Sequence, residues 1–206
     1  MGFRGQLLLM IIGVMCYCAV PLLVRGQHNL PDSQQQISAA VSAAPENLQQ
    51  EATVLGYDAD TTLATLREGT NELICLADDP RDPNFHVACY HNDLEPFMKR
   101  GRELREKGMS RKEVDLIRRS EIKSGALPMP EKPMALYSLS GSEGAFDYEA
   151  GRIEEAAPRY VIYVPYATEE STGLPAKPVS KGAPWIMEPG TPWAHIMVIP
   201  GRSIEQ

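Results

Sequence analysis

A long apolar segment near the start of the chain limits where the remainder can fold. Residues 7–24 are 18 almost wholly apolar residues, with Arg4 before them, Pro21 near their end and the small Gly26 just after them. This order is typical of a secretory signal peptide. We predict that residues 1–26 are a signal peptide cleaved after Gly26 and that the chain is exported, periplasmic or extracellular. The alternative is an uncleaved N-terminal anchor, for which the segment is slightly short.

Export would also decide the state of the cysteines. Cleavage removes Cys16 and Cys18 and leaves Cys75 and Cys89. An even pair in an exported chain predicts a disulfide, since thiols oxidise outside the cytoplasm. The bridge would close a loop with 13 residues between the cysteines, which contributes about 3 kcal/mol in the chain-entropy model. Two buried thiols are the alternative.

The charge of the chain excludes one broad class of partner. Without residues 1–26 the chain has 18 basic and 27 acidic residues, a net charge of −9. An acidic protein binds nucleic acid poorly, so we predict no nucleic-acid partner. The remaining 180 residues suit one domain.

Basic residues are concentrated in one part of the chain. Residues 99–123 carry ten basic and five acidic side chains, a net charge of +5. One interpretation is docking to an anionic surface or envelope partner through Arg102, Arg105, Arg118 and Arg119. The other is a pair of solvated helices whose surfaces are stabilised by ion pairs at i,i+4 spacing.

The order of predicted elements indicates an α+β fold. Residues 27–50 are expected to be a polar spacer with short helices, and residues 51–206 a single domain. Short β-branched and aliphatic segments with turn residues between them predict a three-stranded meander within residues 51–76. Further strands are expected at 133–139, 159–166 and 194–199. We therefore predict a mostly antiparallel sheet of about five to six short strands with a helical pair packed on one face.

Two helices are expected between residues 92 and 125. The first would begin at Asn92 or Asp93 and end at Gly108, where glycine permits the left-handed conformation of a helix end. Ser110 and Glu113 form a capping-box sequence that predicts the start of the second helix. Gly125 would end that helix.

The chain has no Gly-x-Ser-x-Gly, His-Glu-x-x-His, phosphate-loop or dinucleotide-binding motif. Its candidate metal ligands also fit poorly. Cys75, His86, Cys89 and His91 could supply four zinc ligands, but their spacing is not that of a known zinc finger. The aspartates between residues 77 and 84 lack the glycine and glutamate of a calcium loop. We predict no metal site and no cofactor.

A ligand site is predicted around the last strand. His195 and Trp193 lie at its start, and Trp185 and Tyr166 flank the long loop before it. Aromatic side chains beside a histidine could form a ligand pocket. His195 could also act as a general base with Glu188, Glu169 or Glu170, and the alternative is a histidine with an ordinary structural hydrogen bond.

Several segments resemble a family of exported bacterial proteins of unknown function. The similar segments are Leu66-Arg-Glu-Gly-Thr-Asn71, Cys75, Asp78-Asp-Pro80 and Cys89, and then residues 163–172, Pro184-Trp-Ile-Met187 and Ala194-His-Ile-Met197. The resemblance covers residues 52–199. It implies a bacterial exported protein with this order of elements and implies no activity.

Three functions are consistent with these features. The first is a non-enzymatic exported domain that binds a ligand or partner. The second is a hydrolase-like enzyme that uses His195 with a nearby carboxylate. The third is an envelope structural or assembly factor that docks through the basic segment 99–123.

Overall fold

The computed structural model describes residues 1–2 and 30–201 of the chain. The predicted signal peptide and its cleavage site lie outside these residues, apart from Met1 and Gly2. Within the described residues, no helix combines the length and the apolar character that crossing a membrane requires.

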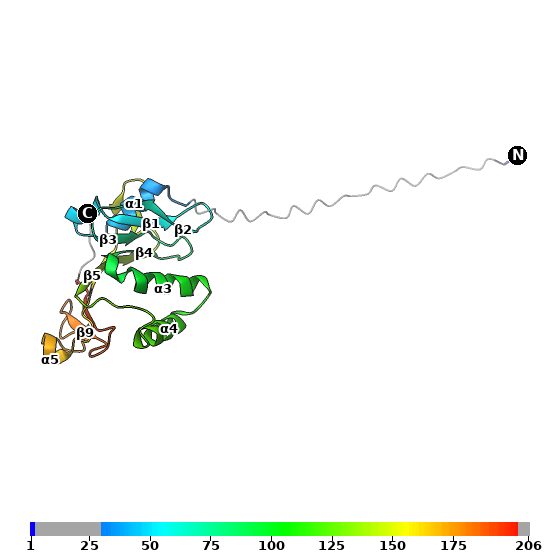
Figure 1. Ribbon diagram of the computed structural model, residues 1–206. Helices are drawn as coiled ribbons and strands as arrows, with labels where there is room; N and C mark the ends of the chain where they lie inside the picture. Colours follow the sequence, from blue (N-terminus) through cyan, green and yellow to red (C-terminus); the bar gives the residue numbers. More distant parts are fainter. Residues whose placement is uncertain (3–29, 202–206) are drawn as a thin grey trace.

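Runs of strands and runs of helices follow one another along the described part of the chain (Figure 1). The helices are α1 (Ser33–Val41), α2 (Glu46–Gln49), the 3-10 turn η1 (Asn92–Leu94), α3 (Glu95–Glu106), α4 (Arg111–Lys123) and α5 (Glu169–Thr172). The strands are β1 (Thr53–Tyr57), β2 (Leu63–Arg67), β3 (Leu73–Leu76), β4 (Phe85–His91), β5 (Met134–Gly141), β6 (Phe146–Asp147), β7 (Arg152–Ile153), β8 (Ala157–Tyr163), β9 (Trp185–Met187) and β10 (His195–Val198).

The α+β class is confirmed, but the predicted sheet is too small. Eight strands form one mixed sheet in the order β2-β1-β3-β4-β5-β8-β10-β9, and β6 and β7 form a separate hairpin. Six of the seven pairings in the large sheet are antiparallel, and β1 pairs with β3 in parallel. The sequence did not predict β4, which joins the two halves of the sheet, or the short β9 within the long loop after β8.

The first three strands are present, but they do not form the predicted meander. The chain leaves β2, crosses the start of β1 and adds β3 on the other side. The backbone N–H groups of Thr70 and Asn71 donate to the carbonyl oxygen of Glu51 during this crossing. A Cβ at Gly69 would lie 2.2 Å from the backbone nitrogen of Thr53. Only glycine lets the two backbones approach so closely.

The two faces of the sheet are covered by different helices. Side chains alternate between the faces along each strand, so Cys75 and Cys89 share one face with the buried Ile37 and Ala40 of α1. We call this the α1 face. Tyr90 lies on the opposite face, where it packs with residues of η1, α3 and the segment after α4, and we call this the α3 face.

Residues 33–49, assigned from the sequence to a spacer with short helices, form α1 and α2. Asp32 and Gln35 cap the start of α1 with reciprocal hydrogen bonds. Ala39 and Ala40 are completely buried against the sheet. This segment is therefore part of the hydrophobic core.

The helical pair α3 and α4 follows the local sequence signals closely. Pro96 lies in the first turn of α3, and Gly108 after its end has φ +79°. Ser110 and Glu113 form the predicted capping box of α4, and Gly125 has φ +78°. The two helices lie beside each other below the first half of the sheet in Figure 1.

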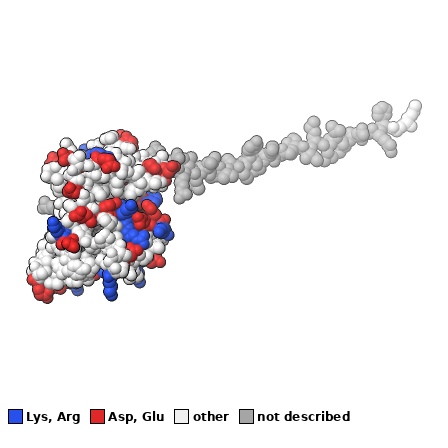
Figure 2. All heavy atoms as spheres, viewed as in Figure 1, with Lys and Arg blue, Asp and Glu red and all other residues white. Residues whose placement is uncertain are grey.

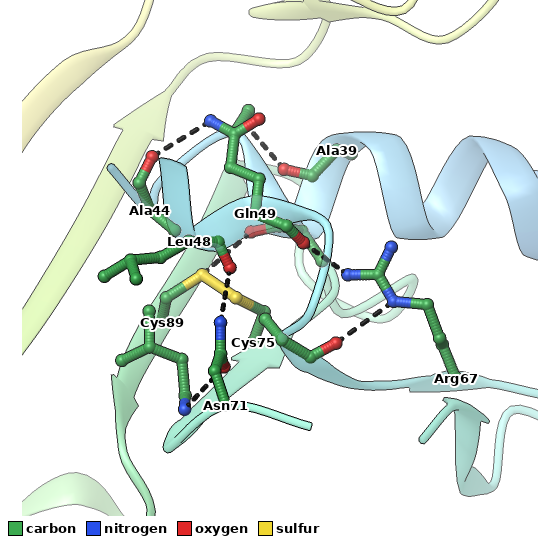
Figure 3. The surroundings of a disulfide bond; sticks show 12 residues. Ala39, Ala44, Leu48, Gln49, Arg67, Asn71, Cys75 and Cys89 are labelled. Atoms are coloured by element: carbon green, nitrogen blue, oxygen red, sulfur yellow. Dashed lines mark hydrogen bonds between the residues drawn. A yellow bond between two sulfur atoms is a disulfide. The ribbon is translucent and has the colours of Figure 1, made fainter. Parts of the chain in front are cut away.

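The predicted disulfide is confirmed. Cys75 and Cys89 are directly opposite each other in the antiparallel pair β3 and β4, and their sulfur atoms are 2.06 Å apart. Both side chains are fully buried in the core of the α1 face. The bond cross-links the hairpin at the base of the loop between β3 and β4 (Figure 3).

Polar side chains from the Leu66–Asn71 segment fasten α2 beside this bond. Arg67 donates to the carbonyl oxygens of Gln49 and Ala52, and the side-chain amide of Asn71 donates to that of Leu48 at 2.8 Å (Figure 3). These contacts satisfy carbonyl groups at the end of a short helix. Arg67 and Asn71 therefore have a structural role, since their side chains donate to carbonyl groups of the chain's own backbone.

Candidate functional site

Trp193, a predicted ligand residue, is enclosed in the core. It is 8% exposed, and its ring meets that of Phe97 edge-on with centroids 4.6 Å apart. The guanidinium carbons of Arg118 and Arg119 each lie 4.7 Å from the Trp193 ring. These contacts leave little of the ring available to a ligand.

His195 is half-buried, and a hydrogen bond to the backbone orients its ring. Nδ1 lies 2.8 Å from the carbonyl oxygen of Trp193, so this nitrogen donates to it as N–H. Burial lowers the pKa of His195. Glu188 instead accepts two hydrogen bonds from Arg119, at 3.0 and 2.8 Å, which lowers the pKa of Glu188.

Trp185 and Tyr166 lie apart from that core. Trp185 is half-buried in β9, opposite Met197 of β10. Tyr166 is 66% exposed with φ +63°. It lines a cavity of about 330 Å³ whose walls include Pro128 and Pro192. The four predicted ligand residues therefore do not converge on one cavity, and the hydrolase reaction remains a prediction.

Most of the arginines proposed to dock an anionic surface make contacts within the protein. Arg102 is 9% exposed and donates to Tyr90 and Glu95. Arg118 forms an ion pair with Asp115 and lies 4.1 Å from the ring of Phe97. In Figure 2 the blue and red side chains over α3 and α4 adjoin one another. Docking through these helices remains a prediction.

A cavity of about 380 Å³ lies between α3 and the sheet. We call it the α3 cavity. Its walls come from the sheet strands β1, β3 and β4, the start of β2, the loop after β3, and the C-terminal half of α3. The lining residues are Tyr57, Leu63, Leu76, Ala77, Asp78, Asp79, Arg81, Asp82, His86, Arg102, Arg105 and Glu106.

Two arginines in this cavity differ in their partners. The guanidinium of Arg81 makes two hydrogen bonds of 2.7 Å with Asp79. This ion pair lowers the pKa of Asp79 despite partial burial. Arg105 is exposed, and no carboxylate in the described part of the chain lies within ion-pair distance of it. Arg105 is therefore a cation available to a bound molecule.

Asp78 is a carboxyl group without a cationic partner. Its Oδ1 accepts a 2.8 Å hydrogen bond from the backbone N–H of His86, and Oδ2 lies 3.4 Å from the hydroxyl of Tyr148. Among the described residues, no basic group forms an ion pair with it. Burial raises its pKa to about 6. Perturbed carboxyl groups in a cavity are candidates for function.

His86 lines the same cavity. Its Nδ1 lies 2.9 Å from the hydroxyl oxygen of Ser140 on the neighbouring strand β5. Burial, followed by the charges of Arg159 and Arg105, lowers the pKa of His86. The imidazole is therefore neutral near pH 7 and offers hydrogen bonding rather than charge.

The sequence identified some of these residues individually but for other chemistry. Asp78, Asp79 and His86 were considered as metal ligands, and Asp78 and Asp79 also belong to a segment of the family resemblance. Within the described residues, no group of three or more His, Cys, Asp or Glu side chains is arranged to hold a metal. Asp78, Asp79 and His86 come together with Arg105 because α3 packs on the sheet. No local sequence motif predicts that packing.

We expect Asp78→Asn to stabilise the protein at neutral pH. The raised pKa of Asp78 means that the folded state favours the protonated carboxyl, so stability falls as pH rises from about 4 to about 6 and stays lower above that. After allowance for partial exposure, the penalty at pH 7 is about 1–2 kcal/mol. Asparagine removes it, because an amide carries no charge.

Urea unfolding at several pH values would measure this effect. At about pH 4 the variant and the wild type should have similar stability, because Asp78 is then largely protonated in the native state. Asp60→Asn, an exposed carboxyl in the turn between β1 and β2, is the matched control and should leave the pH profile unchanged. Parallel pH profiles for Asp78→Asn and wild type would contradict the prediction.

Comparison of the chain with protein-family models, with curated proteins and with solved structures gave no match. The likeness to exported bacterial proteins drawn from the sequence segments thus stays a prediction.

Proposed function

We propose that this protein is an exported domain that binds a small zwitterionic molecule with an apolar body in the α3 cavity. The observation that carries the proposal is the cavity itself, which is lined by the unpaired Arg105, by carboxylates and by apolar side chains. Ligand sites are typically concave and largely apolar, with a few polar groups that fix orientation.

The balance of charge favours a zwitterion over a simple anion. Arg81 is neutralised by Asp79, and Arg102 by Glu95. The charges that remain at the cavity are the guanidinium of Arg105 and the carboxylates of Asp78, Asp82 and Glu106. An anion alone would be attracted by one group and repelled by three. A ligand with both charges can place its carboxylate on Arg105 and its ammonium toward the acids.

The size and wall of the cavity support a small ligand. A volume of about 380 Å³ lies at the lower end of the usual range for ligand pockets. Leu63, Leu76 and Tyr57 supply apolar surface beside the charged groups. Burial of an apolar side chain against them would add about 25 cal/mol for each Å² removed from water.

Two features support a location of the domain outside the cytoplasm. The disulfide between Cys75 and Cys89 is of a kind that persists in oxidising compartments. A domain there meets solutes from the surroundings, and a pocket of this size suits capture of such a solute. The signal-peptide pattern in residues 1–26 supports the same location.

Three probes that share one branched apolar body would test the proposal. Leucine carries both charges, 4-methylpentanoate lacks the ammonium, and 3-methylbutylamine lacks the carboxylate. NMR titration of the Leu63 and Leu76 methyl groups would report binding in the cavity. We expect leucine to bind most tightly of the three.

Arg105→Gln should weaken binding of leucine and 4-methylpentanoate about tenfold, the usual scale for loss of one charged hydrogen bond. Binding of 3-methylbutylamine should not weaken. Arg111→Gln removes an exposed arginine that does not line the cavity and should leave all three affinities unchanged. If none of the probes shifts the two leucines, or Arg105→Gln weakens all three equally, the proposal is wrong.

A further inference from the structure

A second cavity lies on the other side of the loop between β3 and β4. Its volume is about 580 Å³. Asp78, Arg81 and Asp82 line both this cavity and the α3 cavity, so the loop forms the wall between them. The opposite wall comes from the segment around the β6–β7 hairpin, with Phe146 and Tyr148. We call it the aromatic cavity.

Three aromatic rings form one rigid side of this cavity. The rings of Phe85 and Phe146 are stacked with centroids 5.8 Å apart and planes at 9°. Tyr148 meets Phe146 edge-on at 5.1 Å. Phe85 and Phe146 are 4% exposed, whereas Tyr148 is half-buried. The two phenylalanines therefore fix the position of Tyr148, which presents the more accessible ring.

Of the charged groups that line this cavity, the carboxyl of Asp78 lies beside the ring of Tyr148. Its Oδ1 is held by the backbone of His86, and its Oδ2 faces the hydroxyl of Tyr148 at a long 3.4 Å. Arg81 also lines the cavity, but its guanidinium is engaged by Asp79. The carboxylate therefore retains lone pairs for a cationic donor.

We propose that the aromatic cavity binds the ammonium group of a small primary amine, with Asp78 as its counter-ion and Tyr148 as the ring beside its apolar body. An ammonium can donate to Asp78 Oδ2 and lie near the face of an aromatic ring, where the ring quadrupole attracts a cation. The aromatic cavity shares Asp78 with the α3 cavity, but the inference needs neither Arg105 nor the zwitterion proposed there.

Binding of such an amine depends on pH through Asp78. The charged and titratable groups around this carboxyl are Asp79, Arg81 and Asp82 of its own loop, His86 of β4, Glu143 before β6 and Tyr148 after it. Burial raises the pKa of Asp78 to about 6. An ammonium binds the ionised carboxyl, so affinity should fall about tenfold between about pH 7.5 and about pH 5.

Phenethylamine and 2-phenylethanol are matched probes for this site, because they share the ring and differ in charge. NMR titration would follow the ring signals of Tyr148 and Phe146 for the aromatic cavity and the methyl signals of Leu63 and Leu76 for the α3 cavity. We expect phenethylamine to shift Tyr148 and Phe146 and to bind at least tenfold more tightly than 2-phenylethanol.

Asp78→Asn should weaken phenethylamine binding at pH 7.5 about tenfold and remove its pH dependence, while leaving 2-phenylethanol unaffected. The amide oxygen of asparagine can still accept from His86, and a dispersed NMR spectrum would verify the fold. Asp60→Asn is the control and should bind as the wild type does. Equal affinity for the two probes, or wild-type affinity for phenethylamine that does not change with pH, would overturn the proposal whatever the fate of the variant. Shifts confined to Leu63 and Leu76 would overturn it too.

Discussion

Replacement of Phe97 by alanine should lower the free energy of unfolding by about 3–5 kcal/mol, the usual cost of truncating a buried phenylalanine. Phe97 is 2% exposed on the side of α3 that faces the sheet. Its ring contacts those of Trp193 and Tyr163 at centroid distances of 4.6 and 5.7 Å. Alanine would leave a cavity where α3, the sheet and the segment before β10 meet.

The loss should lie toward the upper part of that range because of Arg118. Its guanidinium carbon lies 4.1 Å from the Phe97 ring, and its Nε is buried without a hydrogen-bond partner. The ring therefore compensates part of the cost of burying this cation. Without the ring, the guanidinium would face an empty space or take up water.

Urea unfolding of Phe97→Ala and wild type would measure the difference. Leu116→Ala is the control, because Leu116 is a 59% exposed side chain on α4 and its loss should cost less than about 0.5 kcal/mol. A loss of under about 1 kcal/mol for Phe97→Ala would show that α3 is not held by this cluster.

Removal of the disulfide should cost about 3 kcal/mol. The double variant Cys75→Ala/Cys89→Ala frees a loop with 13 residues between the cysteines, so the unfolded chain gains conformational entropy. Alanine is the appropriate replacement, since both positions are fully buried among apolar side chains and serine would bury a hydroxyl group.

Reductant provides the internal control for this variant. Thiol reagent should lower the stability of the wild type toward that of the double variant and should leave the double variant itself unchanged. Mass spectrometry with thiol alkylation would verify that the bond has been broken. Equal stability of the oxidised and the fully reduced wild type would contradict a stabilising role for the bond.

Local signals in the sequence predicted the helical pair well. A serine and a glutamate at capping-box spacing, and a glycine after each helix, act within one or two turns of the chain. The structure places α4 directly after Ser110 and ends both helices before Gly108 and Gly125. Such signals need no knowledge of distant residues.

Strand β4 was missed although its residues alternate between the two faces of the sheet. Phe85, Val87 and Cys89 point to the α1 face, whereas the alternate positions begin with His86 in the α3 cavity. In the sequence, His86, Cys89 and His91 suggested metal ligands rather than a central strand. The parallel pairing of β1 with β3 is equally invisible locally, because it depends on the crossing at Gly69.

Prediction of the candidate site from the sequence had the same limit, since it could not account for distant packing. Tryptophan is a residue type that often lines ligand pockets, yet Phe97 and two arginines enclose Trp193. Asp78 and Arg105 lie 27 positions apart in the chain, and only the packing of α3 on the sheet brings them to one cavity. Neither burial nor convergence of this kind follows from the pattern of residues along the chain.

The bridge between β3 and β4 has a consequence for both cavities. Asp78 lies three residues after Cys75, and His86 three residues before Cys89, so each stands equally far inside the covalent ring. The backbone of His86 then ties Asp78 across that ring. The loop between β3 and β4 separates the two cavities, and the disulfide at its base limits its thermal motion. Unlike an ion pair, this covalent bond is not weakened by water or salt. Reduction of the disulfide would therefore loosen this loop, and the α3 cavity and the aromatic cavity would change shape together.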